Sequence, residues 1–188
     1  MHNATFAATL WSPDRSPALR FAVLAGLGSL LLAISAKIQV PFWPVPMTMQ
    51  TYVVLALAAA YGWRLGAATV ALYLAQGFAG LPVFAGAAAG PAYMMGPTAG
   101  YLVGFLAAAF IVGWLSERGW DRSITAMLVA MTVGHLVIFI FGWSWLATLI
   151  GPEKAYVAGV APFFAATVLK TLLAAATLPA LWSLIGRR

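Results

Sequence analysis

The sequence predicts an all-α integral membrane protein with six transmembrane helices. Of its 188 residues, 63% are hydrophobic and only 7% are charged, whereas soluble domains carry about 45–50% apolar and about 25% charged residues. No Asp, Glu, Lys or Arg occurs between Arg64 and Glu117, or between Arg122 and Glu153. Uncharged segments of this length must lie in lipid or against one another. An ordinary soluble domain is therefore excluded.

The six spans are predicted from the need for about 20 mainly apolar residues per membrane-crossing helix. They cover residues 19–37, 48–62, 66–80, 98–116, 123–145 and 162–186, within one membrane domain of residues 1–188. The connection between the first two spans holds three prolines and is predicted to be a rigid, extended loop. Glycines and prolines in residues 80–97 predict that this stretch is not a continuous helix.

The distribution of cations predicts the orientation in the membrane. Seven arginines fall on one side of the six-span arrangement: Arg15, Arg20, Arg64, Arg118, Arg122, Arg187 and Arg188. Lys37 and Lys154 fall on the other side, and Lys170 lies within the last span. Because cytoplasmic loops carry an excess of Lys and Arg, both termini are predicted to be cytoplasmic. The net charge of +6 is thus interpreted as a topology signal and not as a sign of nucleic-acid binding.

Lys170 is the strongest candidate for a functional residue. A lysine at membrane depth costs about 2.5–3.5 kcal/mol on insertion scales and by default marks a function. The alternative is that its aliphatic stem carries the ammonium to the outer surface. No predicted span contains an acid that could pair with it, so an anionic ligand is a natural partner. Thr167 lies three residues earlier on the same helical face and could add a hydroxyl to the same pocket.

Three further polar residues lie in or beside the spans. The Gln50 amide, at the start of the second span, would suit an amide-like or ureido-like group, and a helix cap with an interhelical hydrogen bond is an equal alternative. Lys37 is interpreted as an interfacial anchor in preference to a ligand contact. His135 is interpreted as an interhelical contact, with proton handling as the alternative.

The stretch from Gly80 to Tyr101 is a candidate binding segment. Irregular backbone at membrane depth is tolerated only where protein buries it or where it lines a cavity, and broken helices of this kind mark binding sites in many transporters. Phe84 and Tyr93 could flank a flat ligand. The alternative is an outer surface loop that binds nothing.

Small residues recur at four-residue spacing along the first span. Ala22 and Gly26 form one row, and Ala25, Ser29 and Ala33 form another. Such faces allow close helix–helix approach. Whether they meet another helix of this chain or a partner protein is left open by the sequence.

Several classes of function are excluded by missing motifs. The chain has no cysteine, no nucleotide-binding GxxxxGK[ST] and no GxSxG nucleophile motif. No His, Asp and Glu cluster has metal-ligand spacing, and no span holds a carboxylate that could drive a proton or sodium pump. The sequence therefore predicts neither an enzyme nor a cofactor or metal site, but a binding cavity without its own energy source.

Three segments resemble a known family. VPMTMQ at residues 45–50, YLAQGFAGLPVF at 73–84 and GPTAGYLVGF at 96–105 are similar, in order and spacing, to patterns of the BioY family. That family comprises the biotin-specific substrate-binding (S) components of energy-coupling factor (ECF) transporters, and the resemblance covers nearly the whole chain. It implies an outward-opening vitamin pocket in a multi-pass protein of the bacterial cell (inner) membrane. It also implies a transmembrane coupling (T) protein and two cytoplasmic ATPases as partners.

The resemblance also implies residue roles. Lys170 would hold the biotin carboxylate, Phe84 and Tyr93 would pack the rings and chain, and the polar ring would be addressed by Gln50, Thr167 and the Gly86 backbone. The small-residue rows of the first span would meet the coupling protein.

One segment departs from the family pattern and keeps other functions open. The family's PFxPGDxxK reads PFFAATVLK here, at residues 162–170, so Thr167 stands where an Asp would be. A neutral hydroxyl is a weaker partner than a carboxylate. The alternatives are an S component for another small anionic vitamin and a non-transporting membrane scaffold subunit.

Overall fold

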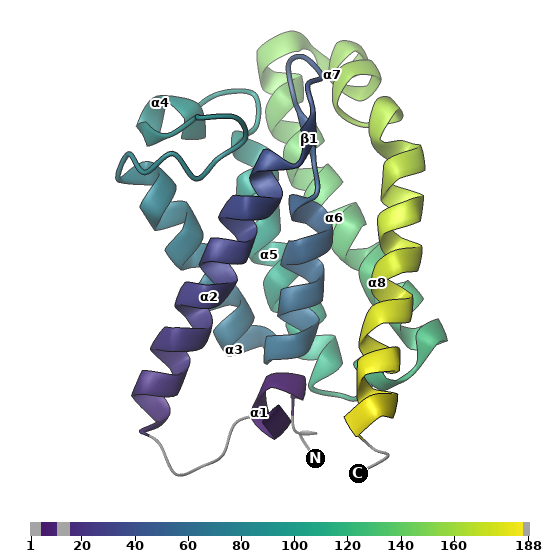
Figure 1. Ribbon diagram of the computed structural model, residues 1–188. Coiled ribbons are helices and arrows are strands. Elements are labelled where there is room, and N and C mark those ends of the chain that lie inside the picture. Colours follow the sequence, from purple (N-terminus) through teal and green to yellow (C-terminus); the bar gives the residue numbers. More distant parts are fainter. Residues whose placement is uncertain (1–4, 11–15, 186–188) are drawn as a thin grey trace.

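The computed structural model describes residues 5–10 and 16–185, which form a bundle of long helices with one very short hairpin (Figure 1). The elements, in chain order, are α1 (Phe6–Leu10), α2 (Pro17–Lys37), β1 (Gln39–Val40), β2 (Met47–Thr48), α3 (Gln50–Phe78), α4 (Gly90–Met94), α5 (Ala99–Ser116), η1 (Trp120–Arg122), α6 (Ile124–Ile150), α7 (Pro152–Gly159), η2 (Ala161–Phe163) and α8 (Phe164–Ile185). β1 and β2 pair antiparallel, with Gln39 opposite Thr48. The prediction of an all-α membrane protein is confirmed.

Helix α3 is bent back on itself at Gly62. The backbone there has φ 79° and ψ 174°, a conformation that only glycine adopts readily. The Gln50 side chain donates a hydrogen bond to the Tyr73 hydroxyl at 2.6 Å, although a straight helix would hold these residues about 34 Å apart. The two arms of α3, residues 50–61 and 63–78, therefore run side by side in opposite directions. They correspond to the predicted second and third spans.

Five helical segments among the described residues are long and apolar enough to cross a membrane: Pro17–Lys37, Gln50–Phe78, Ala99–Ser116, Ile124–Ile150 and Pro152–Leu184. Because α3 consists of two antiparallel arms, these five segments overlap all six predicted segments. The fifth span was predicted to end at about residue 145, and helix α6 continues to Ile150 and stops at Gly151, where φ is 86°. The short helix α7, which follows at once, was not predicted.

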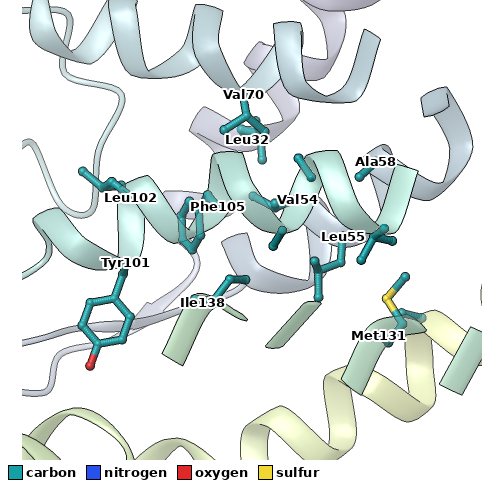
Figure 2. Packing of buried hydrophobic residues seen from close by; sticks show 14 of the residues in the cluster. Leu32, Val54, Leu55, Ala58, Val70, Tyr101, Leu102, Phe105, Met131 and Ile138 are labelled. Carbon is teal, nitrogen blue, oxygen red and sulfur yellow. The ribbon is translucent and has the colours of Figure 1, made fainter. Parts of the chain in front are cut away.

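Close contacts between neighbouring helices hold the bundle together. Helix α3 packs against α2 and α5, α5 packs against α6, and α6 packs against α7 and α8. At the α5–α6 contact, a Cβ atom on Gly104 would lie only 2.9 Å from the Ile138 Cα. The buried side chains shared by these helices include Leu32, Val54 and Phe105, which point into one core (Figure 2). Large apolar residues on the outer faces stay exposed, as lipid-facing surfaces require.

The two ends of the bundle carry different cations in the described residues, arginines at one end and Lys37 and Lys154 at the other. Helix α1 and the end of α8 lie at one end, and the hairpin, α4 and α7 lie at the other (Figure 1). The Arg20 guanidinium donates to the Ala7 carbonyl at 2.9 Å, and the Trp182 indole donates to Asp121 at 2.5 Å. These contacts bring α1, α2, η1 and α8 together at the arginine-bearing end. Three arginines of the predicted inner set, Arg15, Arg187 and Arg188, lie outside the described residues.

The small-residue rows of α2 face in different directions. Ala25 and Ser29 are buried, and the Ser29 hydroxyl donates to the Gln76 side chain of α3 at 2.5 Å. Ala33 packs partly buried against the same core. Ala22 and Gly26 are exposed, and a Cβ on Gly26 would meet nothing within 4 Å. The row of Ala25, Ser29 and Ala33 therefore meets a helix of this chain, and the row of Ala22 and Gly26 faces outward.

Candidate ligand-binding site

A small cavity lies near the hairpin end of the bundle. It has a volume of about 50 Å³ and is lined by residues of the hairpin, α3, α4, α5, α6 and α8. Four of the six predicted ligand-binding residues line it: Lys170, Thr167, Gln50 and Tyr93. Ligand pockets commonly measure about 300–1,000 Å³. The cavity must therefore widen to admit a vitamin-sized ligand.

Lys170 is buried in the bundle, next to the hairpin. Its side chain is 8% exposed, and its Nζ donates to the Thr48 carbonyl at 2.6 Å and to the Thr51 hydroxyl at 3.2 Å. These two contacts use two of the three N–H donors of the ammonium. Because a cation is held in a mainly apolar wall by neutral oxygens alone, the site favours an anion.

Gln50 makes the interhelical hydrogen bond that the sequence allowed, and its contact with a ligand stays a prediction. It lines the cavity, and its Nε2 joins the two arms of α3 through the Tyr73 hydroxyl at 2.6 Å. The Tyr73 hydroxyl in turn donates a hydrogen bond to the Val83 carbonyl of the following loop at 3.0 Å. The Gln50 Oε1 accepts from the Thr48 hydroxyl at 3.2 Å. The amide is thus fixed in orientation, with one N–H left to meet a ligand.

Phe84 and Tyr93 lie against each other instead of on opposite sides of the cavity. Their rings stack with centroids 5.0 Å apart and an interplanar angle of 18°. Tyr93 lines the cavity, whereas Phe84 is 1% exposed and sits behind it, against Gly77. A Cβ on Gly77 would overlap the Phe84 ring. Burial raises the pKa of the Tyr93 phenol, so the cavity wall is neutral on this side.

Gly86 lies outside the lining of the cavity. Its carbonyl accepts from the Lys37 Nζ at 2.5 Å, next to the carbonyls of Pro82 at 2.6 Å and Phe84 at 2.8 Å. The Lys37 ammonium is therefore bound by protein and is not simply an interfacial anchor. Its three partners follow 45 to 49 residues later in the chain, so no local sequence pattern could have indicated them.

His135 joins α6 to α8, which agrees with its interpretation as an interhelical contact. Its side chain is 3% exposed, and its Nδ1 lies 3.0 Å from the Met131 carbonyl and 3.1 Å from the Thr171 hydroxyl. It does not line the cavity.

Sequence reasoning missed several residues of the cavity wall. Thr51 contacts Lys170, and four aromatic residues also line the cavity: Tyr101, Phe105, Phe139 and Phe163. Tyr101 and Phe105 stand four residues apart in the GPTAGYLVGF segment, which places them on one helical face. That spacing was a usable signal. Phe139 and Phe163 lie within ordinary apolar sequence.

A family model, described as the BioY family, matches residues 6–187. The chain belongs to the BioY family. A probable biotin transporter BioY of Pyrococcus horikoshii is 38% identical over 151 residues, covering 80% of this chain and 89% of that protein. The biotin transporter BioY of Rhizobium etli is 37% identical, covering 84% and 86%. That of Thermotoga maritima is 34% identical, covering 84% and 92%.

A solved structure shares the fold of this BioY family member. It is the crystal structure of the S-component for biotin from an ECF-type ABC transporter, with a TM-score of 0.79 and 20% identity. The match covers 92% of this chain and 95% of the other. The S-component fold expected from the sequence is therefore confirmed.

Proposed function

We propose that this protein is the biotin-binding S component of an ECF-type vitamin transporter. It captures biotin at the hairpin end of the bundle and delivers it inward with a transmembrane coupling protein and two cytoplasmic ATPases. Its setting is the bacterial inner membrane, with the arginine-rich end facing the cytoplasm. Three relatives that are named as biotin transporters support this proposal. The outward-facing row of Ala22 and Gly26 is the proposed contact with the coupling protein.

The single observation that carries the proposal is the buried Lys170 ammonium in the wall of an otherwise neutral cavity. Biotin carries a carboxylate on an aliphatic chain and a ureido group on its bicyclic ring. Lys170 would bind the carboxylate, since a hydrogen bond to a charged group contributes about 1.5–3 kcal/mol. The aromatic wall would cover the chain and rings. Gln50 and Thr167 would hydrogen-bond the ureido group.

The two predicted residues outside the cavity lining take indirect roles in this proposal. Phe84 supports the Tyr93 ring from behind. The Gly86 carbonyl is occupied by Lys37, so its backbone would reach the ligand only after the loop that carries it moves.

The proposed function predicts that binding depends on the ligand's charge. The detergent-purified chain should bind biotin, and biotin methyl ester should bind at least roughly tenfold more weakly, because the ester removes the charge but keeps the ring. Isothermal titration calorimetry with both ligands measures the difference. Folded protein that binds no biotin would overturn the proposal. A screen of other small anionic vitamins would then test the alternative within the transporter class, and intact assembly without any ligand would favour a scaffold subunit.

Thr167 gives a second prediction, because it stands where the family pattern has an Asp. A Thr167→Val substitution keeps the shape and removes the hydroxyl. It should weaken biotin binding by roughly 3- to 10-fold, as expected for one neutral hydrogen bond. The same titration measures this, with Thr148→Val as the control, since Thr148 is exposed and its hydroxyl donates to the Trp145 carbonyl in its own helix at 2.6 Å. Unchanged affinity would remove Thr167 from the site.

A further inference from the structure

We propose that Lys37 is a positioning residue that holds the 79–89 loop over the central cavity and thereby limits the rate at which ligand enters and leaves. The 79–89 loop joins α3 to α4. The part of the proposal that concerns ligand rests on the proposed function above. The Lys37 Nζ donates to three carbonyls of this loop, those of Pro82, Phe84 and Gly86, at 2.6, 2.8 and 2.5 Å. An ammonium has three N–H donors, so the loop takes all of them.

The loop that Lys37 holds forms one wall of the cavity. Ala85, between two of the bonded carbonyls, lines the cavity. Phe84 anchors the loop to the bundle, because its ring is buried between the rings of Tyr73 and Tyr93, at centroid distances of 5.5 and 5.0 Å. Tyr93, which Phe84 supports, lines the cavity as well. The position of the loop therefore decides how far this side of the cavity is closed.

Few other polar contacts hold the loop to the bundle. Its remaining hydrogen bonds are mostly internal or to the end of α3, such as Phe84 N–H to the Ala88 carbonyl at 3.2 Å. The Tyr73 hydroxyl bonds the Val83 carbonyl at 3.0 Å. Lys37 thus supplies three of the four side-chain hydrogen bonds to the loop in the described part of the chain. It is also the last residue of α2, directly before the hairpin, so it joins the two segments that cover the cavity.

The cavity must open for a ligand, and the 79–89 loop is one of the two non-helical walls, beside the hairpin, that can move. The present volume of about 50 Å³ holds only about three to five waters. The opposite walls belong to α5 and α6, whose backbones touch at Gly104 and Ile138. Moving those helices apart would unpack the core, whereas moving the loop breaks the Lys37 bonds and withdraws Phe84. The Lys37 contacts are therefore a barrier to ligand entry on the side of the 79–89 loop.

The loop can be tested without ligand, because the chain has no cysteine. A single Ala85→Cys reporter would be reacted with a water-soluble maleimide in detergent, alone and combined with Lys37→Met, Lys37→Arg or Lys154→Met. Lys154 is an exposed lysine near the same end and serves as the control. We expect Lys37→Met to raise the reaction rate on the order of tenfold, because charge-assisted hydrogen bonds are lost. Lys37→Arg should restore part of the protection, and Lys154→Met should change nothing.

Equal maleimide rates in the reporter alone and in its Lys37→Met form would overturn the proposal. Size-exclusion chromatography confirms that each variant is folded. If Lys37→Met does not fold, Lys37→Gln, which keeps neutral donors, takes its place under the same criterion.

Ligand exchange gives the second readout, measured without the cysteine reporter. Radiolabelled biotin should leave the Lys37→Met protein on the order of tenfold faster than the unmodified protein. Biotin association should also become faster, so that the affinity changes less than either rate constant. If Lys37 had only a structural role, Lys37→Met would lower the thermal stability and leave both rate constants unchanged. Should no protein bind biotin, the proposed function fails and the maleimide rates still decide the role of Lys37. Normal biotin exchange together with unchanged maleimide rates would leave the function standing and overturn the loop proposal.

Discussion

Replacing Lys170 with methionine should reduce biotin affinity by at least roughly thirtyfold, because truncating one member of a buried charge pair costs about 2–5 kcal/mol. Methionine keeps most of the length and apolar volume of the lysine stem, so the cavity wall stays filled. The lost group is the ammonium, which in the free protein bonds the Thr48 carbonyl and the Thr51 hydroxyl. Calorimetric titration of the detergent-purified variant with biotin measures the effect.

Two comparisons make the Lys170 result specific. Lys154→Met removes the same charge from an exposed position on α7 and should bind biotin normally. Biotin methyl ester should bind the native protein and Lys170→Met with similar affinity, because the neutral ester forms no charge pair with either protein. A Lys170→Met protein that is folded and binds biotin with native affinity would show that the carboxylate is held elsewhere.

The sequence could predict most of the polar side of the site, because polar residues at membrane depth must face the protein interior. That reasoning placed Lys170 and Thr167 in one pocket, and the resemblance to the BioY family added Gln50; all three line the cavity. It could not show that Gln50 also ties the two arms of α3 together. That hydrogen bond exists only because α3 reverses at Gly62.

The loop residues were predicted less well, since the path of an irregular segment depends on tertiary contacts. Glycine and proline content indicated a broken helix, and residues 79–89 are indeed non-helical. Composition gave no information on which aromatic ring would face the cavity. Because Gly77 has no side chain, the Phe84 ring packs against it. The Phe84 ring therefore lies behind the Tyr93 ring and does not line the cavity. The role of Lys37 was hidden for the same reason, because its partners are distant in sequence.

The end of helix α6 has a clear physical cause. The fifth span was predicted to end near Trp145, and tryptophan is enriched at membrane interfaces. In the structure the Trp143 indole donates to the Pro152 carbonyl at 3.2 Å, and the Trp145 indole donates to the Gly96 carbonyl at 2.9 Å. They connect α6 to neighbouring segments while the helix continues. The helix stops at Gly151, which Pro152 follows.

The second large effect is expected at Gly113, where α5 crosses the bend of α3. A Cβ on Gly113 would lie 2.5 Å from the Trp63 backbone nitrogen and 2.6 Å from the Gly62 carbonyl carbon. Both are main-chain atoms, so no side-chain rotation can relieve the clash. Overpacking of this kind costs about 1–3 kcal/mol. Gly113→Ala should therefore lower the melting temperature by roughly 3–10 °C, given about 2–4 °C per kcal/mol for a chain of this size.

Gly26→Ala is the matched control for Gly113→Ala, because it places the same methyl group on a helix where nothing lies within 4 Å. Alanine is the better helix former by about 1 kcal/mol, so this variant should melt at or above the native temperature. Thermal unfolding in detergent, followed by the loss of the monodisperse size-exclusion peak, measures both variants. If Gly113→Ala melted like the native chain, α5 would not approach the α3 bend as closely as the structure places it. The two variants should differ in melting temperature because the two arms of α3 depend on backbone contact between α5 and the turn at Gly62. That turn reverses the direction of α3, so that its second arm runs back toward the end of the bundle that holds the cavity.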